Sequence, residues 1–395
     1  MTEAYNEPLR FGSFIPPIIR PIYDPTTSYQ RVLELVEFCD RIGFDEAWFG
    51  EHHNGGWEIV NTPEIMIASA IERTKNIKLG TGVTSLPYHH PLHVVQRMVM
   101  LDHLSRGRVI LGTGPGSLAW DAHIHGMDYQ GNRKRLGEAL EAIMQLLRSD
   151  EPVTMETDWF KLVDAQLQVK PYTRPHFEVS AAGTASPAGP RLAGKHGISL
   201  LSIAASSPAG FEALAGTWEA VEKEAAEHGQ TVDRSGWRLV SFYHIAETEA
   251  QAREEAKYGL LHLIEYFSKT TGLADGLSDI TDFDRTLDEL NESGLMVIGT
   301  PDRLVEHVES FQKQTGGFGA FLGFGHEMAD REATLKSHEL VMRDVAPHFQ
   351  KRTDRQQENF GRVTALRENW NSEVAQAQAK ASADWEAKRQ GRAGS

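Results

Sequence analysis

The sequence predicts an α/β fold of the (β/α)8 type, a TIM barrel, and three observations support this prediction. Short runs rich in β-branched and aromatic residues alternate with longer segments whose apolar residues recur at helical spacing. Eight candidate strands follow one another, which is the number that closes a barrel of this type. The 395 residues are enough for one such barrel with additions.

The first four strand and helix pairs lie before position 150. Because each strand leads into a helix, neighbouring strands must run parallel and connect through crossovers. The predicted pairs occupy residues 10–16 and 27–42, 46–50 and 63–73, 77–84 and 91–104, and 109–113 and 132–147. Later predicted strands lie at 177–181, 198–203, 239–246 and 319–324, and later helices near 187–195, 208–228, 301–314 and 330–345.

Two segments do not fit this repeat. The stretch at about 248–298 is too long for a simple connection, so we expect an insertion before the last strand. It should be helical over 248–267, continue as a loop rich in Gly, Ser and Asp, and cap the barrel or pack on a partner subunit. The barrel then spans 1–349, and residues 350–395 form a polar helical C-terminal extension, with partial disorder as the alternative.

The composition excludes several classes of partner. Lysine and arginine number 40 against 55 aspartates and glutamates, a formal net charge of −15. No window gathers enough basic residues to follow a phosphate backbone, so we expect neither nucleic acid nor an anionic membrane as partner. The start of the chain lacks an apolar signal core, which predicts a cytoplasmic protein. Cys39 is the only cysteine, which excludes an internal disulfide.

The most informative motif is Glu51-His52-His53, which directly follows the second predicted strand. Imidazole has an ordinary pKa of about 6.5, so a histidine pair exchanges protons readily near neutral pH. Paired histidines in a surface turn are usually inert, but the carboxyl ends of barrel strands are where barrel enzymes place their active sites. We therefore predict that His52 and His53 are catalytic.

Three other strand ends carry small or hydroxyl side chains. The third strand ends in residues 81–85, which include Thr81, Thr84 and Ser85 and would let a flat ring lie close to the backbone. The fourth ends in the glycine-rich run 112–117 with Thr113 and Gly114, where Ser117 breaks the dinucleotide pattern G-x-G-x-x-G. A nicotinamide site is thus excluded, whereas the edge of another cofactor still fits.

The connection after the fifth strand, residues 179–189, combines hydroxyls and small residues with Pro187 at the start of a helix. Free backbone N–H groups at such a helix start suit a phosphate. The alternative is an ordinary serine N-cap before the proline.

His123-Ile124-His125 has the H-x-H spacing of metal-dependent barrel hydrolases. Zinc would need further ligands at strand ends, and this pair lies in a loop after the fourth strand rather than at the end of the first. We expect no metal.

Taken together, residues 43–53, residues 79–83 with His90-Pro91-Leu92, and residues 101–108 resemble the bacterial luciferase-like flavin monooxygenases. The order and spacing match over about residues 10–345, and the likeness is greatest to the limonene 1,2-monooxygenase-like branch. Three motifs in order are far more specific than any one alone.

The resemblance implies a (β/α)8 barrel that uses reduced flavin, FMN with FAD as the alternative, to activate O2 through a flavin C4a-hydroperoxide. It implies a separate NAD(P)H:flavin reductase, a homodimer and a small apolar organic substrate, terpene-like or ketone-like. An apolar pocket would exclude water, and we assign to it Phe14, Trp48, Trp57 and Trp120.

The resemblance also implies residue roles. His52 matches the catalytic histidine of the family and His53 its neighbour, while residues 81–85 match the strand end against the isoalloxazine, often with a non-proline cis peptide. Arg133 matches a phosphate-binding arginine, although luciferase has a second one where this chain has Pro115. The implied cofactor-binding residues are Thr81, Thr84, Ser85, Thr113, Gly114, Arg133, Ala182, Gly183, Thr184 and Ser186.

Two alternatives remain open at this stage. The same barrel and histidine region occur in oxidoreductases that transfer hydride with the deazaflavin F420. The chain could also be a non-catalytic flavin-binding relative, because barrel folds persist without activity.

Overall fold

The computed structural model describes residues 5, 7–16, 18–271 and 282–393. The chain divides into two compact units, Met1–Phe349 and Gln350–Ser395. The first unit contains the sheet and the candidate site, and the second contains helices only.

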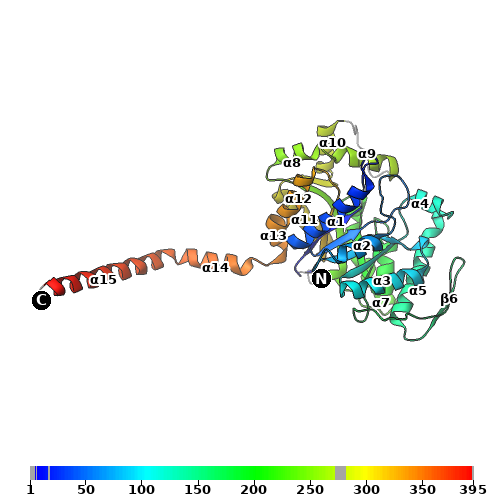
Figure 1. Cartoon of the computed structure of the whole chain (residues 1–395), viewed down its shortest axis with the longest axis horizontal. Helices are drawn as coiled ribbons and strands as arrows, with labels where there is room; N and C mark the ends of the chain where they lie inside the picture. The colour runs from blue at the N-terminus through cyan, green and yellow to red at the C-terminus, as the bar shows by residue number, and fades with distance from the viewer. Residues whose placement is uncertain (1–4, 6, 17, 272–281, 394–395) are drawn as a thin grey trace. The chain divides into compact units, whose positions relative to one another are not determined.

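Eight parallel strands close a barrel in the first unit, so the predicted fold class is confirmed (Figure 1). Neighbouring strands pair in chain order, with β10 between β9 and β12, and the last barrel strand, β12, closes the ring by pairing with the first, β1. The barrel strands are β1 (Arg10–Ile15), β2 (Glu46–Phe49), β3 (Lys78–Thr81), β5 (Val109–Gly114), β8 (Glu178–Gly183), β9 (Ser199–Ser202), β10 (Trp237–Ile245) and β12 (Ala320–Phe324). A two-residue strand, β4 (Thr84–Ser85), extends the line of β3 and pairs with β5.

Helices cover the outside of the barrel (Figure 1). Several begin with proline, whose missing N–H costs nothing in a first turn. Caps fix their starts, as where Asp24 accepts a hydrogen bond from the Thr27 N–H. The helices are α1 (Pro25–Ile42), α2 (Pro63–Ile71), α3 (Pro91–Ser105), α5 (Asn132–Arg148), α6 (Ala188–His196), α7 (Pro208–Glu227), α11 (Pro301–Thr315) and α12 (Arg331–Leu340), which continues through a π-helical turn (Val341–Val345) into α13 (Ala346–Gln350).

The two ends of the barrel differ chemically. At the amino end, the fully buried Arg238 forms ion pairs with Glu46 at 2.6 Å and with Glu178 at 2.7 Å. Above this layer Trp48 fills the interior, and Gly112 makes room for it because a Cβ there would lie 2.9 Å from the indole ring. The carboxyl end, which we call the mouth, remains for the candidate site.

The insertion is more structured than predicted. The expected single helix is two, α8 (Glu249–Ala256) and α9 (Leu260–Thr270), separated at Gly259, and a third helix, α10 (Phe283–Glu292), follows. The segment ends in a strand, β11 (Met296–Gly299), which pairs with the carboxyl half of β10. Part of the expected Gly-, Ser- and Asp-rich loop, residues 272–281, lies outside the described residues.

Two further elements lie where the sequence was interpreted as loop. A hairpin of β6 (Val153–Glu156) and β7 (Lys161–Ala165) follows α5, and the short helix α4 (Ala119–Ile124) follows β5. The second unit consists of α14 (Asp354–Ala365) and α15 (Arg367–Ala393), as expected for a helical extension. Among the described helices, none combines the length and apolar character that crossing a bilayer requires.

Candidate active site

The candidate site lies at the mouth, in the loop that follows β2. Glu51, His52 and His53 come directly after the last residue of this strand, Phe49, and Gly50. A carboxylate from α4, Asp121, reaches the same place from the connection after β5. The barrel therefore brings together residues nearly 70 positions apart in sequence.

His52 is held between two carboxylates. Its Nδ1 lies 2.8 Å from Asp121 Oδ2, and its Nε2 lies 3.4 Å from Glu58 Oε2. Asp121 also accepts the backbone N–H of His53 at 2.9 Å through its other oxygen. Since the His52 side chain is only 16% exposed, its ring has a fixed orientation.

The surroundings of His52 favour its protonated form. Burial lowers the pKa of the imidazole, but the nearby carboxylates of Glu58 and Asp121 raise it by more, so the pKa lies above its ordinary value of 6.5. Burial has the opposite effect on Glu58 and raises the pKa of that carboxyl. The other Glu58 oxygen accepts a hydrogen bond from the hydroxyl of Tyr266 on α9.

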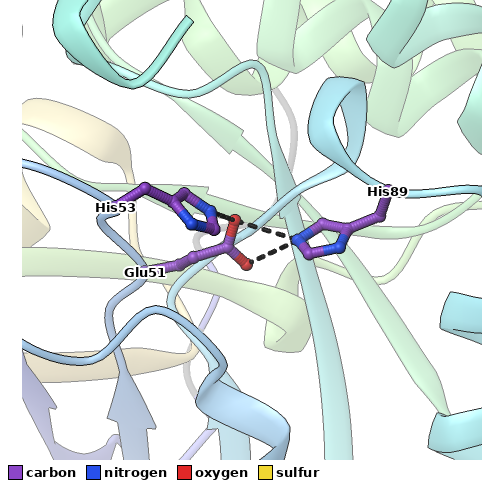
Figure 2. Close-up of side chains that lie close together, drawn as sticks. All are labelled: Glu51, His53 and His89. Atoms are coloured by element: carbon purple, nitrogen blue, oxygen red, sulfur yellow. Dashed lines mark hydrogen bonds and ion pairs between the residues drawn. The ribbon is translucent and has the colours of Figure 1, made fainter. Parts of the chain in front are cut away.

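A second cluster joins Glu51 to two histidines, which approach its carboxylate from opposite sides (Figure 2). His53 Nε2 lies 3.1 Å from Glu51 Oε1, and His89 Nε2 lies 3.1 and 3.2 Å from the two oxygens. The backbone N–H of Ser85 also donates to Oε1, at 3.3 Å. Burial raises the pKa of Glu51, but these two imidazoles lower it by more, so the carboxyl stays ionised.

The ligand atoms of Glu51, His53 and His89 all lie within 4.8 Å of one another. Two imidazoles and a carboxylate are ligands that zinc accepts. The carboxylate, however, stands at hydrogen-bonding distance from both rings, so imidazole N–H donors already satisfy it. In the H-x-H motif, His125 stacks on Tyr88, whereas His123 packs against Trp120.

The predicted ring-binding residues lie at the carboxyl ends of β3, β4 and β5. The peptide bond between Gly82 and Val83 is cis, which matches the non-proline cis peptide that the family resemblance implies here. The Thr81 hydroxyl donates to the Gly112 carbonyl at 2.8 Å, and the Thr113 hydroxyl donates to the Ser180 carbonyl at 3.0 Å. The protons of these two hydroxyls therefore link strands, which leaves each oxygen only as an acceptor for a further hydrogen bond.

The buried Thr84 hydroxyl, on β4 at the mouth, has no hydrogen-bond partner within the described part of the chain. The Ser180 hydroxyl is also buried without a described partner, but Ser180 lies in the middle of β8, in register with Gly112 beside Trp48, and so below the mouth. Ser85 is the register partner of Gly114 on β5. A buried hydroxyl without a partner is costly unless a ligand or water satisfies it, so Thr84 marks a place that a polar ring edge could fill.

The predicted phosphate residues lie at the starts of two helices. Arg133 is exposed in the first turn of α5 and forms no ion pair with any described residue. Helix α6 begins after Pro187 without a side-chain cap, so Ser186 is not the serine N-cap that the alternative interpretation required. Thr184 is exposed, while Ala182 and Gly183 end β8 in close contact with the helix at Gly189, where a Cβ would lie 2.4 Å from the Ala182 carbonyl oxygen.

The predicted aromatic pocket is only partly assembled. Phe14 and Trp48 belong to one buried apolar cluster, and Trp57 packs against it and against Tyr266, with ring centroids 5.7 Å apart. Trp48 is fully buried in the barrel interior, so it supports the site from below rather than facing a substrate. Trp120 lies outside the cluster and is 63% exposed, which corrects its assignment to an apolar wall.

A cavity of about 290 Å³ lies beside the mouth between α1, the start of α9 and the loop after β12. Its walls include Ile18, Tyr23, Arg31, Tyr258 and His326. None of the predicted site residues lines it. Because the hydrogen-bonded histidines and the unpartnered Thr84 hydroxyl lie elsewhere, we place the chemistry at the strand ends and not in this cavity.

Sequence reasoning missed the residues that hold the histidines. Asp121, Glu58, His89 and Tyr266 come from four separate segments, and no local pattern distinguishes them from surface residues. One weak signal exists, because Glu58 is a carboxylate between the apolar residues Trp57 and Ile59 in the loop that follows the histidine pair. The partners of a buried histidine depend on the tertiary fold.

Comparisons with known proteins agree with this geometry. The profile of the family described as luciferase-like monooxygenase matches residues 9–317. The chain is 48% identical over 349 residues to limonene 1,2-monooxygenase from Rhodococcus erythropolis, covering 88% of each protein. It is 40% identical over 374 residues to 4-hydroxyprotoasukamycin monooxygenase from Streptomyces nodosus subsp. asukaensis, covering 94% of this chain and 98% of the relative.

A solved structure is similar over the same region. It is the oxygenating constituent of 3,6-diketocamphane monooxygenase from Pseudomonas putida, a type II Baeyer-Villiger monooxygenase in complex with FMN. The TM-score is 0.73 at 25% sequence identity, and the match covers 86% of this chain and 98% of that one.

Proposed function

The chain belongs to the luciferase-like monooxygenase family, and from that membership we propose that it is a flavin-dependent monooxygenase that oxygenates a small apolar organic substrate with reduced FMN and O2. The observation that carries the proposal is the buried His52, held between Asp121 and Glu58 at the mouth of a closed barrel. The names of the two relatives and the FMN in the similar solved structure support the cofactor and the reaction type.

The residues at the mouth fit a flavin. The small residues at the ends of β3 and β5 leave room for a flat ring, and the unpartnered hydroxyl of Thr84 could meet its polar edge. The uncapped N-terminus of α6 and the free guanidinium of Arg133 suit a phosphate. When bound, reduced flavin supplies the electrons that reduce O2.

The protein's own residues orient, shield and supply protons. Phe14 and Trp57, with the buried cluster around them, keep water from the reacting centre. His52 holds a proton at Nε2 while Asp121 fixes the ring through Nδ1. Positioned proton transfer of this kind typically contributes about 10² to 10⁴ in rate.

The proposal includes two protein partners. No dinucleotide fingerprint occurs at the glycine-rich strand end, so a separate NAD(P)H:flavin reductase would supply reduced FMN. We also propose a homodimer, as is usual for such barrels, and a cytoplasmic location. Sedimentation velocity of the full chain tests the dimer.

Flavin binding and turnover test the proposed function. We expect fluorescence titration to show tighter binding of reduced FMN than of FAD or F420. With chemically reduced FMN, O2 and a panel of terpenes and cyclic ketones, His52→Ala should lower the product yield by about 10² to 10⁴. His123→Ala, the same change at an exposed histidine on α4, should leave the yield unchanged, and equal yields from both variants would contradict the role of His52.

A further inference from the structure

We propose that Glu58 is a positioning residue that shares one proton with His52 and passes it to the ring in each turnover. This inference rests on the proposed function and adds the source of the proton that His52 handles. Neither the sequence analysis nor the family resemblance assigned any role to Glu58.

The geometry leaves His52 one nitrogen for proton exchange. Its Nδ1 lies 2.8 Å from Asp121 Oδ2, so the N–H at this position donates to a buried carboxylate. The other nitrogen, Nε2, lies 3.4 Å from Glu58 Oε2. A proton on this side of the ring therefore belongs either to His52 or to Glu58.

The insertion fixes the position of Glu58. Its Oε1 accepts a hydrogen bond from the hydroxyl of Tyr266 on α9, so Oε2 is the oxygen left to face His52. Trp57 packs over Tyr266, and the Glu58 side chain is only 6% exposed. The pair is thus shielded from bulk water, which would otherwise exchange protons with His52 directly.

The charges around the pair favour one shared proton. Asp121 on α4 and Glu51 in the same loop face His52, while Tyr266 and Asp121 face Glu58. Burial lowers the pKa of His52 but the three carboxylates together raise it above its ordinary value, and burial raises the pKa of Glu58. Near neutral pH, ionised Glu58 with protonated His52 and neutral Glu58 with neutral His52 are thus both accessible.

The reaction consumes a proton that this pair can supply. Oxygenation by the monoanion of reduced flavin consumes one proton, as FMNH⁻ + O2 + S + H⁺ → FMN + SO + H2O, where S is the substrate. The shared proton passes from the Glu58 carboxyl to Nε2, and His52 gives it from Nε2 to the reacting oxygen. Glu58 is left as a carboxylate that still accepts the Tyr266 hydrogen bond, and water restores its proton after product release.

The first test is NMR titration of ¹⁵N-labelled histidines in the full chain without flavin. The variant Glu58→Gln keeps the size and the acceptor for Tyr266 but removes the charge. We expect the midpoint of His52, assigned with His52→Asn, to fall by about 1 to 3 pH units. The matched control is Glu255→Gln, the same change beside another buried histidine, His244, at 2.8 Å, and it should leave the His52 midpoint unchanged.

A second variant covers the case in which Glu58→Gln does not fold. Tyr266→Phe keeps the Glu58 carboxyl but removes the hydrogen bond that favours its charged form, so the His52 midpoint should fall by a smaller amount. An unchanged His52 midpoint in the folded variants overturns the inference.

Turnover separates this inference from the proposed function. In Glu58→Gln the basic limb of the kcat profile should move to lower pH, with an unchanged KM for substrate and more released peroxide. If the wild type fails to oxygenate any substrate with reduced FMN, the proposed function is wrong, whereas the NMR midpoint still decides whether Glu58 and His52 share a proton.

Discussion

Glu51 orients two of the imidazoles at the mouth, because its buried carboxylate accepts hydrogen bonds from His53 and His89 on opposite sides (Figure 2). The protonation state of His89 depends on the Glu51 carboxylate. Burial lowers the pKa of His89, but the hydrogen bond to Glu51 and its charge raise it by more. The cluster is therefore a buried ion pair with a second imidazole attached, next to the pair formed by His52 and Glu58.

Replacing Glu51 by Gln should destabilise the protein by about 1 to 3 kcal/mol, since a buried acceptor of two N–H groups becomes an amide that also carries donors. The pKa of Glu51 is lowered in the folded protein, so its ionised form stabilises the fold above pH 4.5, and this stabilisation is lost as the pH falls through the folded pKa. The pKa of His89 is raised, so its protonated form stabilises the fold fully below pH 6.5, and this stabilisation is lost as the pH rises through the folded pKa.

The difference in unfolding free energy between wild type and Glu51→Gln should therefore be largest between about pH 4.5 and 6.5. Urea denaturation at a series of pH values measures it. A difference that stays constant across this range would show that the ion pair does not contribute.

At the residue scale, the sequence predicts the histidines of the site but not the carboxylates that hold them. His52 and His53 are recognisable because they directly follow an apolar strand, and the structure gives both of them carboxylate partners. Asp121 and Glu58 are not recognisable, because a carboxylate in a loop looks alike in sequence whether it is buried or exposed. Trp48 and Trp120 are both assigned to the pocket wall because they are aromatic, but Trp48 is fully buried and Trp120 is exposed. Aromatic character alone does not distinguish the interior from the surface.

At the element scale, the contact between α6 and β8 determines where the uncapped helix N-terminus points. Gly189, in the first turn of α6, lies against the end of β8, where a Cβ would be 2.4 Å from the Ala182 carbonyl oxygen and 2.6 Å from the Gly183 Cα. Both neighbours are backbone atoms, which cannot move aside as a side chain would. Only glycine lets the helix approach this closely.

Substituting Gly189→Ala should destabilise the fold by about 1 to 3 kcal/mol through overpacking. It should also weaken FMN binding, because it pushes the N-terminus of α6 away from β8. Gly216→Ala in α7 is the matched control, since a Cβ there meets nothing within 4 Å. Isothermal titration with FMN measures both variants. Equal affinities would show that this helix end does not bind the phosphate.

Periodicity predicted the barrel strands and their helices well, because strands buried on both faces are continuous apolar runs. It failed for β11 and for the hairpin of β6 and β7. The four residues of β11 are too short a run to distinguish from the end of an insertion. Only Val153 of β6 and Leu162 of β7 are buried, so the hairpin lacks the run of apolar residues by which a strand is predicted.

At the scale of the whole molecule, the barrel separates stability from chemistry. The buried ion pairs of Arg238 hold the amino end of the barrel, and the histidines and the unpartnered Thr84 hydroxyl occupy the mouth. Such a division is usual for barrel enzymes, in which connections at the mouth vary while the opposite end stays packed. The alternation of strands and helices predicted this plan, but the pairing of Arg238 with Glu46 required the three-dimensional register.

The barrel unit should be stable without the second unit, because the chain divides into two compact units after Phe349. Helices α14 and α15 expose several large apolar residues, among them Phe360, Trp370 and Trp385. A chain that ends at Thr353 should keep the thermal midpoint and the turnover of the full chain, because a compact unit with its own apolar core can fold alone. Calorimetry measures the midpoint, and a fall of several degrees would contradict the prediction.

The most direct test of the central claim, that reduced flavin and O2 react at the mouth beside His52, is a single turnover under ¹⁸O2. Protein loaded with chemically reduced FMN is mixed with ¹⁸O2 and an apolar terpene or ketone, and the product is analysed by mass spectrometry. We predict one ¹⁸O atom in the product and the other in water, with the labelled yield falling by about 10² to 10⁴ in His52→Ala. Product that forms without O2, or that carries no label, would contradict the account.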